Sequence, residues 1–69
     1  MEAINVCING QNRQVPTDTT LSSLIELFNL KGKSIAFELN RRVIERASYA
    51  TTRLNENDAV EIVHFVGGG

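Results

Sequence analysis

The chain has 69 residues, a formal net charge of −1 and a hydrophobic content of 42%. A chain this short forms one small domain, burying only about 60% of the surface of its unfolded form, and leaves little room for an enclosed catalytic pocket. The near-neutral charge argues against a nucleic-acid partner, and no apolar run approaches the roughly 18 residues of a membrane span. Cys7, the single cysteine, cannot form an internal disulfide, so we expect a cytoplasmic protein.

The first part of the chain predicts a hairpin. Ala3 to Asn9 alternates apolar and polar residues, as a half-buried strand does. Asn9-Gly10 is a strong turn signal, because both residues accept positive φ angles. Gln11 to Val15 then returns as a second strand, polar enough for a sheet edge, and Pro16 is expected to end its pairing.

One amphipathic helix follows, from Thr20 to Phe28. The Thr20 hydroxyl is suited to cap the first turn, and Asn29 and Gly32 occur where a helix would end. The apolar residues recur at helical spacing and predict one buried face. They are Leu21, Leu24, Ile25, Leu27 and Phe28.

The second half of the chain predicts three more strands. They are expected at Ile35 to Asn40, Val43 to Glu45 and Ala59 to Phe65, the first two joined by a turn at Asn40-Arg41-Arg42. Between the second and third of these strands we expect a helical turn around Ser48 to Ala50, a core position for Leu54, and a turn from Asn55 to Asp58. Within that turn, Asn57 is the residue best suited to a left-handed backbone.

The order of elements is strand-strand-helix-strand-strand-strand. A right-handed crossover would lay the helix on one face of the sheet and bring the first and last strands together in parallel. The fold class is therefore predicted as α+β, a β-grasp (ubiquitin-like) fold with a five-stranded mixed sheet and one main helix. We expect residues 1–65 to form this domain and residues 66–69 to be a flexible C-terminal glycine tail.

The last strand carries the candidate partner-binding residues. If Val60 and Ile62 face the helix, alternation places Glu61, Val63 and Phe65 on the opposite face of the sheet. Exposed apolar side chains beside a tail are typical of a protein-binding surface, and Val66 would extend it. The alternative is that Val63 and Phe65 complete the rim of the core.

Two other reactive side chains have simpler interpretations than catalysis. His64 is interpreted as a partly exposed strand residue rather than a proton shuttle, because a general base needs a positioned partner. Cys7, in mid-strand, lacks the accessible electropositive setting of a reactive thiol. No Cys/His cluster has the spacing of metal ligands, so we expect no metal site.

Taken together, these segments resemble the ThiS family of sulfur carriers in thiamin (thiazole) biosynthesis, over essentially the whole chain. Two turns depart from the family pattern: Asn40-Arg41 stands where Asn-Gly is common, and Asn57-Asp58 where Gly-Asp is common. The segments that carry the resemblance are Asn9-Gly10, Thr20-Leu21 with Leu24, Ala36 to Asn40, Asp58 to Val63, and Phe65-Val66-Gly67-Gly68-Gly69.

The resemblance implies that Gly69 is the modified residue. A ThiF-like enzyme would use ATP to adenylate its carboxylate, a cysteine desulfurase would supply sulfur to form a thiocarboxylate, and a ThiG-like thiazole synthase would take that sulfur. Gly67, Gly68 and Gly69 would thread into the partner's site, since glycine permits close backbone approach. The chain itself would be a carrier, not an enzyme, and would bind no cofactor.

Two other functions stay open at this point. The chain could carry sulfur for another pathway, such as molybdopterin synthesis or a cysteine-forming route. Alternatively, it could be a β-grasp binding module or protein modifier without sulfur chemistry, whose terminal glycine is incidental or forms an isopeptide bond to lysine.

Overall fold

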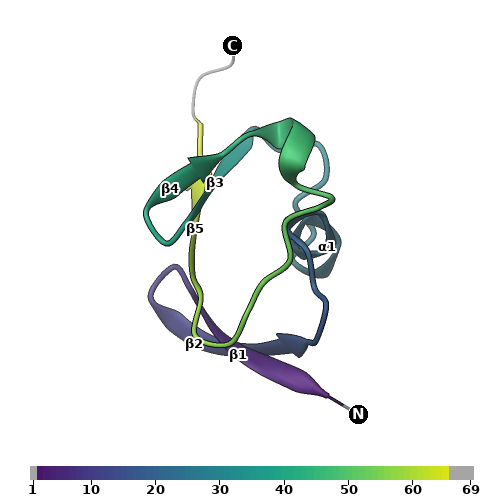
Figure 1. Ribbon diagram of the computed structural model, residues 1–69. Helices are drawn as coiled ribbons and strands as arrows, with labels where there is room; N and C mark the ends of the chain where they lie inside the picture. The colour runs from purple at the N-terminus through teal and green to yellow at the C-terminus, as the bar shows by residue number, and fades with distance from the viewer. Residues whose placement is uncertain (1, 66–69) are drawn as a thin grey trace.

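The computed structural model describes residues 2–65, which form a five-stranded sheet curled around one helix (Figure 1). The strands lie in the order β2-β1-β5-β3-β4. β1 and β5 pair in parallel, and the other neighbours pair antiparallel. The elements are β1 (Ala3–Ile8), β2 (Gln11–Pro16), α1 (Leu21–Leu27), β3 (Ile35–Leu39), β4 (Arg42–Ile44), the 3₁₀ helix η1 (Arg46–Ser48) and β5 (Ala59–His64).

The predicted β-grasp fold is confirmed, including the parallel pairing of the first and last strands and the edge position of β2. The predicted flexible tail, residues 66–69, lies outside the described residues. No helix within residues 2–65 is long and apolar enough to cross a membrane.

The helix begins where its capping residue predicts. The Thr20 hydroxyl accepts a hydrogen bond from the backbone N–H of Ser23 at 3.1 Å, and the Ser23 hydroxyl accepts one from the backbone N–H of Thr20 at 3.3 Å. This reciprocal capping box satisfies two donors that the helix leaves unpaired. At the other end, Phe28 is the C-cap and Asn29 has a left-handed backbone with φ of 57°.

The buried stripe of α1 is narrower than predicted. Leu21 and Leu24 are fully buried against the sheet, and Ile25 and Phe28 pack on the core. Leu27, however, is 55% exposed, so its predicted place in the stripe is wrong. Successive helical residues turn by about 100°, which carries Leu27 away from the face that the other four share.

An aromatic pair that the sequence did not predict closes the core under η1. Tyr49 is buried and meets the fully buried ring of Phe37 edge-to-face, with 5.0 Å between ring centroids. The short helix spans Arg46–Ser48, two residues earlier than predicted, and Tyr49 follows it directly. Leu54 is buried, as predicted. The buried apolar residues are Val6, Ile8, Val15, Leu21, Leu24, Leu30, Ile35, Phe37, Tyr49, Leu54 and Val60.

Several strand ends differ from prediction by one residue. Asn9, Asn40 and Phe65 each lie just beyond their strand, whereas Pro16 is the last residue of β2 and pairs with Ala3. β4 also begins one residue early, at Arg42. The cause at Asn9 and Asn40 is a positive φ angle, 51° and 52°, which breaks the extended backbone at the turn.

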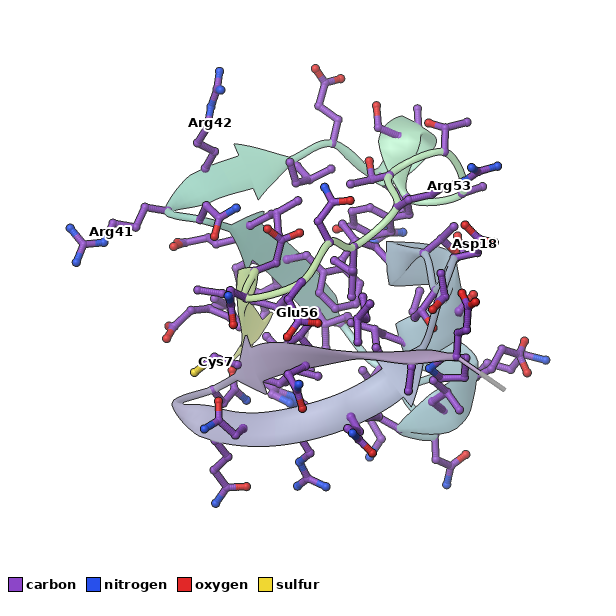
Figure 2. The ribbon with its side chains drawn as sticks, turned by 60° about the horizontal axis from the view of Figure 1, so that its bottom comes forward. Cys7, Asp18, Arg41, Arg42, Arg53 and Glu56 are labelled. Atoms are coloured by element: carbon purple, nitrogen blue, oxygen red, sulfur yellow. The ribbon has the colours of Figure 1, made fainter. Side chains whose placement is uncertain are left out.

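The turn before β5 is fastened to β1. Asn57 has the predicted left-handed backbone, with φ of 70°, and its N–H donates to the Asn5 carbonyl at 2.7 Å. The carboxylate of Glu56 accepts hydrogen bonds from the backbone N–H of Asn5 at 3.0 Å and from its side-chain amide at 3.1 Å. Figure 2 shows Glu56 directed toward β1. These bonds fix the point at which β5 starts.

Glu56 should make this anchorage pH-dependent. The backbone hydrogen bond from Asn5, and then its side-chain bond, lower the pKa of Glu56 below the ordinary 4.5. Because the folded-state pKa is the lower one, the contribution of Glu56 to stability is present above the unfolded pKa and is lost as the pH falls through the folded pKa.

We therefore expect Glu56→Gln to lower the melting temperature at pH 7 and to have progressively less effect below pH 4.5. Thermal melts across the acid range measure this, with Glu45→Gln, an exposed carboxylate at the start of η1, as the control. Equal wild-type and Glu56→Gln stability at neutral pH would show that the carboxylate does not fasten the turn.

Candidate functional site

The candidate site is the end of β5 and the sheet face around it. β5 is the central strand, between β1 and β3, and it leads directly to the C-terminal residues. The backbone N–H of Phe65, the last described residue, donates to the Ser34 carbonyl at 2.9 Å. The chain is therefore held in place by the sheet up to the residue that precedes the tail.

Asn9 lengthens the short parallel ladder between β1 and β5. Only two residue pairs are in register there, Cys7 with Ala59 and Ile8 with Val60. The Asn9 N–H donates to the Val60 carbonyl at 2.9 Å, and its side-chain oxygen accepts from the Ile62 N–H at 2.7 Å. The side chain thus replaces the backbone carbonyl that β1 would supply if it continued.

Asn40, in the other hairpin turn, holds the opposite edge of β5. Its N–H donates to the Ala59 carbonyl at 2.7 Å, and its side-chain oxygen accepts from the Ala59 N–H at 2.9 Å. Its side-chain amide also donates to the Asp58 carboxylate at 3.1 Å. Two hairpin asparagines therefore secure β5 from both sides, a role that the sequence analysis did not foresee for either side chain.

The side chains of β5 alternate between the core and solvent as predicted. Val60 is buried and Ile62 packs against the core, whereas Glu61 and Val63 are exposed on the other face. Phe65 is 63% exposed, so it is not a core residue and the alternative rim position does not apply to it. The predicted site also includes Val66 and Gly67 to Gly69, which lie outside the described residues.

Neighbouring strands extend this face with residues that the sequence analysis did not select. In register, Ala36 lies opposite Val63, Glu38 opposite Glu61, and Val43 of β4 opposite Glu38. Val43 is 71% exposed. Strand alternation alone could have suggested these residues, but only the register shows that they share one surface. We call Val43, Glu61, Val63 and Phe65, with Ala36 and Glu38, the outward face.

The glutamates of the outward face form an unfavourable pair. Glu38 and Glu61 are directly opposite on antiparallel strands, an arrangement in which like charges are destabilising. The ion pairs formed within residues 2–65, Lys31 with Glu26 and Arg53 with Asp18, involve neither of them. Carboxylates placed together without a cation of their own suit a surface that meets a basic group on a partner.

The remaining reactive residues do not assemble into a catalytic or metal site. Cys7 is a half-buried free thiol, and His64 is exposed at the end of β5. No group of His, Cys, Asp and Glu within residues 2–65 could hold a metal ion. Arg41 and Arg42 project from the β3–β4 hairpin (Figure 2). Within residues 2–65, the candidate site is thus an exposed sheet face and not a cluster of reactive groups.

These features define a class of protein, a β-grasp domain whose central strand ends beside an exposed apolar face. Comparison with known proteins identifies the family. The sequence matches the ThiS family over residues 6–69. It is 36% identical to the sulfur carrier protein ThiS of Bacillus subtilis, over 90% of this chain and 96% of that protein. The chain therefore belongs to the ThiS family of sulfur carrier proteins of thiamine biosynthesis.

Structural comparison agrees with this assignment. The crystal structure of the thiamine biosynthesis protein ThiS from Geobacter metallireducens superposes with a TM-score of 0.82 at 29% identity, covering 96% of this chain and all of that one. The chain is also 33% identical to a thiazole synthase of Magnetococcus marinus, over 96% of its own length. It spans only 20% of the length of that relative.

The Asn9 side chain offers a direct test of how β5 is held. Asn9→Gly keeps a residue that tolerates the positive φ angle but removes the bond to the Ile62 N–H. We expect faster hydrogen exchange at the Ile62 amide and a loss of about 0.5–1.5 kcal/mol in unfolding free energy.

Asn29→Gly is the matched control, because Asn29 has a similar φ angle of 57° at the end of α1. It should leave exchange at Ile62 unchanged. If both variants affect Ile62 equally, the backbone of the turn, not the Asn9 side chain, secures β5.

Proposed function

We propose that this protein carries sulfur on its C-terminal residue for formation of the thiazole ring of thiamin. The Gly69 carboxylate is adenylated and then converted to a thiocarboxylate. Residues 1–65 act as the folded body and residues 66–69 as the flexible tail that enters the partner's active site. The observation that carries the proposal is the match to the ThiS family, which extends through Gly69 itself.

The chemistry requires an activated carboxyl group. A carboxylate is a poor electrophile, because its charge is delocalised and oxide is a poor leaving group. Attack of a Gly69 oxygen on the α-phosphorus of ATP releases pyrophosphate and leaves an acyl adenylate. The terminal sulfur of a persulfide then displaces AMP, and a second thiol cleaves the resulting acyl disulfide to leave the thiocarboxylate. The carrier contributes no catalytic group to these steps and acts as a co-substrate.

A tail of this composition suits delivery to an enclosed site. An acyl adenylate hydrolyses in water, so the reaction must occur where water is excluded. Four extended residues reach roughly 14 Å beyond the fold, and glycine lets the backbone pass through a narrow entrance. The bonds that hold Phe65 and β5 would keep the position from which the tail extends constant relative to the docked body.

Three partners follow from the proposal: a ThiF-like adenylating enzyme that uses ATP, a cysteine desulfurase-linked sulfur donor and a ThiG-like thiazole synthase. The relation to the Magnetococcus marinus thiazole synthase supports the last of these, because a segment similar to this chain occupies about one fifth of that protein. Joining two functional partners in one chain raises their effective concentration.

The outward face is the proposed docking surface. Its exposed apolar side chains would bury area on binding, with Phe65 as the aromatic anchor that most often dominates an interface. The Glu38–Glu61 pair would gain from a basic group on the partner, which would relieve its repulsion. The proposed surface combines the residues predicted from the sequence, Glu61, Val63, Phe65 and Val66, with Val43 and Glu38 of the adjoining strands.

The position of the terminal carboxylate is the first test of the function. Deleting Gly69 should leave the melting temperature unchanged, because a terminal residue beyond the sheet contributes little to the core. It should abolish ATP–pyrophosphate exchange by a ThiF-like enzyme, because the carboxylate would fall one residue short of the reaction centre.

A variant with one tryptophan appended after Gly69 is the control for length, and it should fail equally, by displacing the carboxylate. Exchange at the wild-type rate with either variant would contradict the proposed role of Gly69.

Phe65→Ala tests the docking surface. Because Phe65 is 63% exposed, we expect its loss to change stability by no more than about 0.5 kcal/mol. As an interface anchor it should raise the KM for the carrier in adenylation about 30-fold, the equivalent of about 2 kcal/mol.

Leu27→Ala removes a comparably exposed apolar side chain from α1, off the outward face, and should leave KM unchanged. Similar KM values for Phe65→Ala and the wild type would remove Phe65 from the interface.

A further inference from the structure

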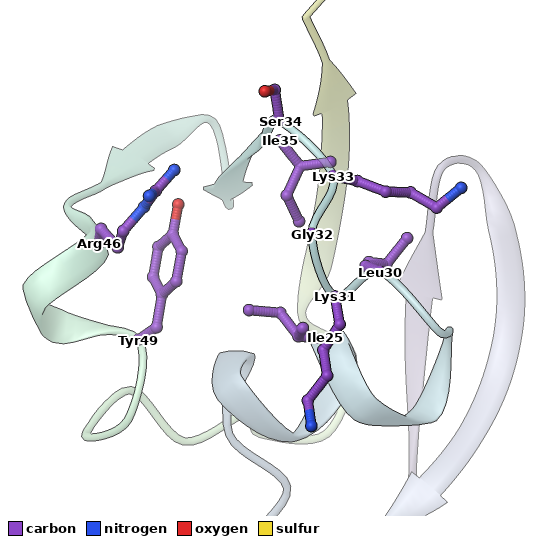
Figure 3. A pocket seen from close by; sticks show the side chains of 9 residues that line it. All are labelled: Ile25, Leu30, Lys31, Gly32, Lys33, Ser34, Ile35, Arg46 and Tyr49. Atoms are coloured by element: carbon purple, nitrogen blue, oxygen red, sulfur yellow. The ribbon is translucent and has the colours of Figure 1, made fainter.

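A second candidate binding feature lies near Phe65, the last described residue. It is a pocket of about 420 Å³ between the segment that follows α1 and the residues around η1. Figure 3 shows Tyr49 and Arg46 on one side and Ile25, Leu30 and Ile35 facing them. This volume falls within the range of sites that bind small groups, and it is separate from the outward face.

The pocket combines apolar walls with a basic rim. Leu30, Ile35 and Tyr49 belong to the buried core, so the walls are held in place by the fold. The Tyr49 ring is further fixed by its edge-to-face contact with Phe37. Three cationic side chains, those of Lys31, Lys33 and Arg46, also line the pocket.

Two of those cations form no ion pair with a carboxylate of residues 2–65. Lys31 pairs with Glu26 at 3.3 Å. Neither Lys33 nor Arg46 takes part in an ion pair formed among residues 2–65. In a chain with a net charge of −1, a local concentration of positive charge around an apolar hollow favours an acidic ligand that also carries an apolar group.

The pocket adjoins the start of the tail. Ser34 lines it, and the carbonyl of the same residue accepts the hydrogen bond from Phe65 at 2.9 Å. Any protein that encloses the tail must cover the surface around this point. The pocket therefore lies next to the region that a partner taking up the tail would approach.

We propose that this pocket receives an acidic segment of the adenylating partner, with one apolar side chain seated between Tyr49 and Ile25, one carboxylate at Arg46 and another at Lys33 on the opposite side of the pocket (Figure 3). The inference rests on the proposed function and deepens it, because it names a second contact with the same partner. The outward face would meet a basic group and the pocket an acidic one. This opposite polarity at two points fixes the orientation of the carrier, and hence the direction in which the tail enters.

The test is steady-state adenylation by a ThiF-like enzyme with the double variant Lys33→Glu/Arg46→Glu. The control is Arg41→Glu/Arg42→Glu, the same charge change at the hairpin that lies at the opposite end of β3. We expect the KM for the carrier to rise at least tenfold in the pocket variant, with kcat and melting temperature retained, and to change less than threefold in the control. Retained kcat at saturation shows that the proposed Gly69 chemistry is intact.

Backbone amide shifts of the labelled carrier locate the contact. On addition of unlabelled enzyme, residues 30–35 and 46–49 should shift in the wild type and not in the pocket variant. An unchanged KM, or an equal rise in the control, overturns the pocket proposal while the sulfur-carrier function stands. Shifts of these same residues on deletion of 66–69 alone would show that the pocket holds the chain's own tail, which also overturns it. A wild-type chain that is not adenylated at all ends both proposals.

Discussion

The parallel contact between β1 and β5 is the constraint on which the rest of the structure depends. It joins the two ends of the sequence, yet only two residue pairs are in register. The contact is completed by side chains: Asn9 extends the ladder to Ile62, and Glu56 fastens the preceding turn to Asn5. With β5 held in this way, its inner residues close the core and its outer residues form an exposed face. Phe65, the last described residue, is then held at a defined place beside Ser34.

This arrangement explains how so small a protein can serve a demanding reaction. The core has one layer of side chains between the sheet and α1. The hydrogen bonds of the protein hold the backbone of β5 and Phe65, which precedes the C-terminal residues. In the proposed function, a body held by the sheet up to Phe65 and followed by a glycine run would let a partner supply the catalytic groups while the carrier supplies the carboxylate. The opposed carboxylates of Glu38 and Glu61 would suit a surface that meets a basic group on that partner.

Local sequence signals predicted most of the fold. The alternation in β1 and β5, the capping Thr20 and the left-handed Asn57 act through neighbouring residues, so each can be interpreted without knowing the tertiary structure. Leu27 was misassigned because its spacing permits a wide stripe, whereas the width of the buried face is set by how α1 sits on the sheet. The burial of Tyr49 and the short shift of η1 likewise depend on packing against Phe37, a contact between distant residues.

The candidate site was predictable only in part for the same reason. Glu61, Val63 and Phe65 follow from alternation within one strand, but Glu38 and Val43 join them through inter-strand register. The bonds of Asn9 and Asn40 to β5 and the basic pocket near Ser34 are likewise products of tertiary assembly. In the sequence, Asn9 and Asn40 are recognisable only as turn residues, and nothing in it brings Lys33 and Arg46 to one pocket.

The central claim is that sulfur is carried on Gly69, and intact-mass analysis tests it most directly. The wild-type chain is incubated with ATP, a ThiF-like enzyme, cysteine and a cysteine desulfurase, and its mass is compared with that of a sample lacking ATP. We expect replacement of one oxygen by sulfur, located by fragmentation at Gly69 and dependent on ATP. An unchanged mass with an enzyme that is active on another carrier, or sulfur found on Cys7 instead, would contradict it.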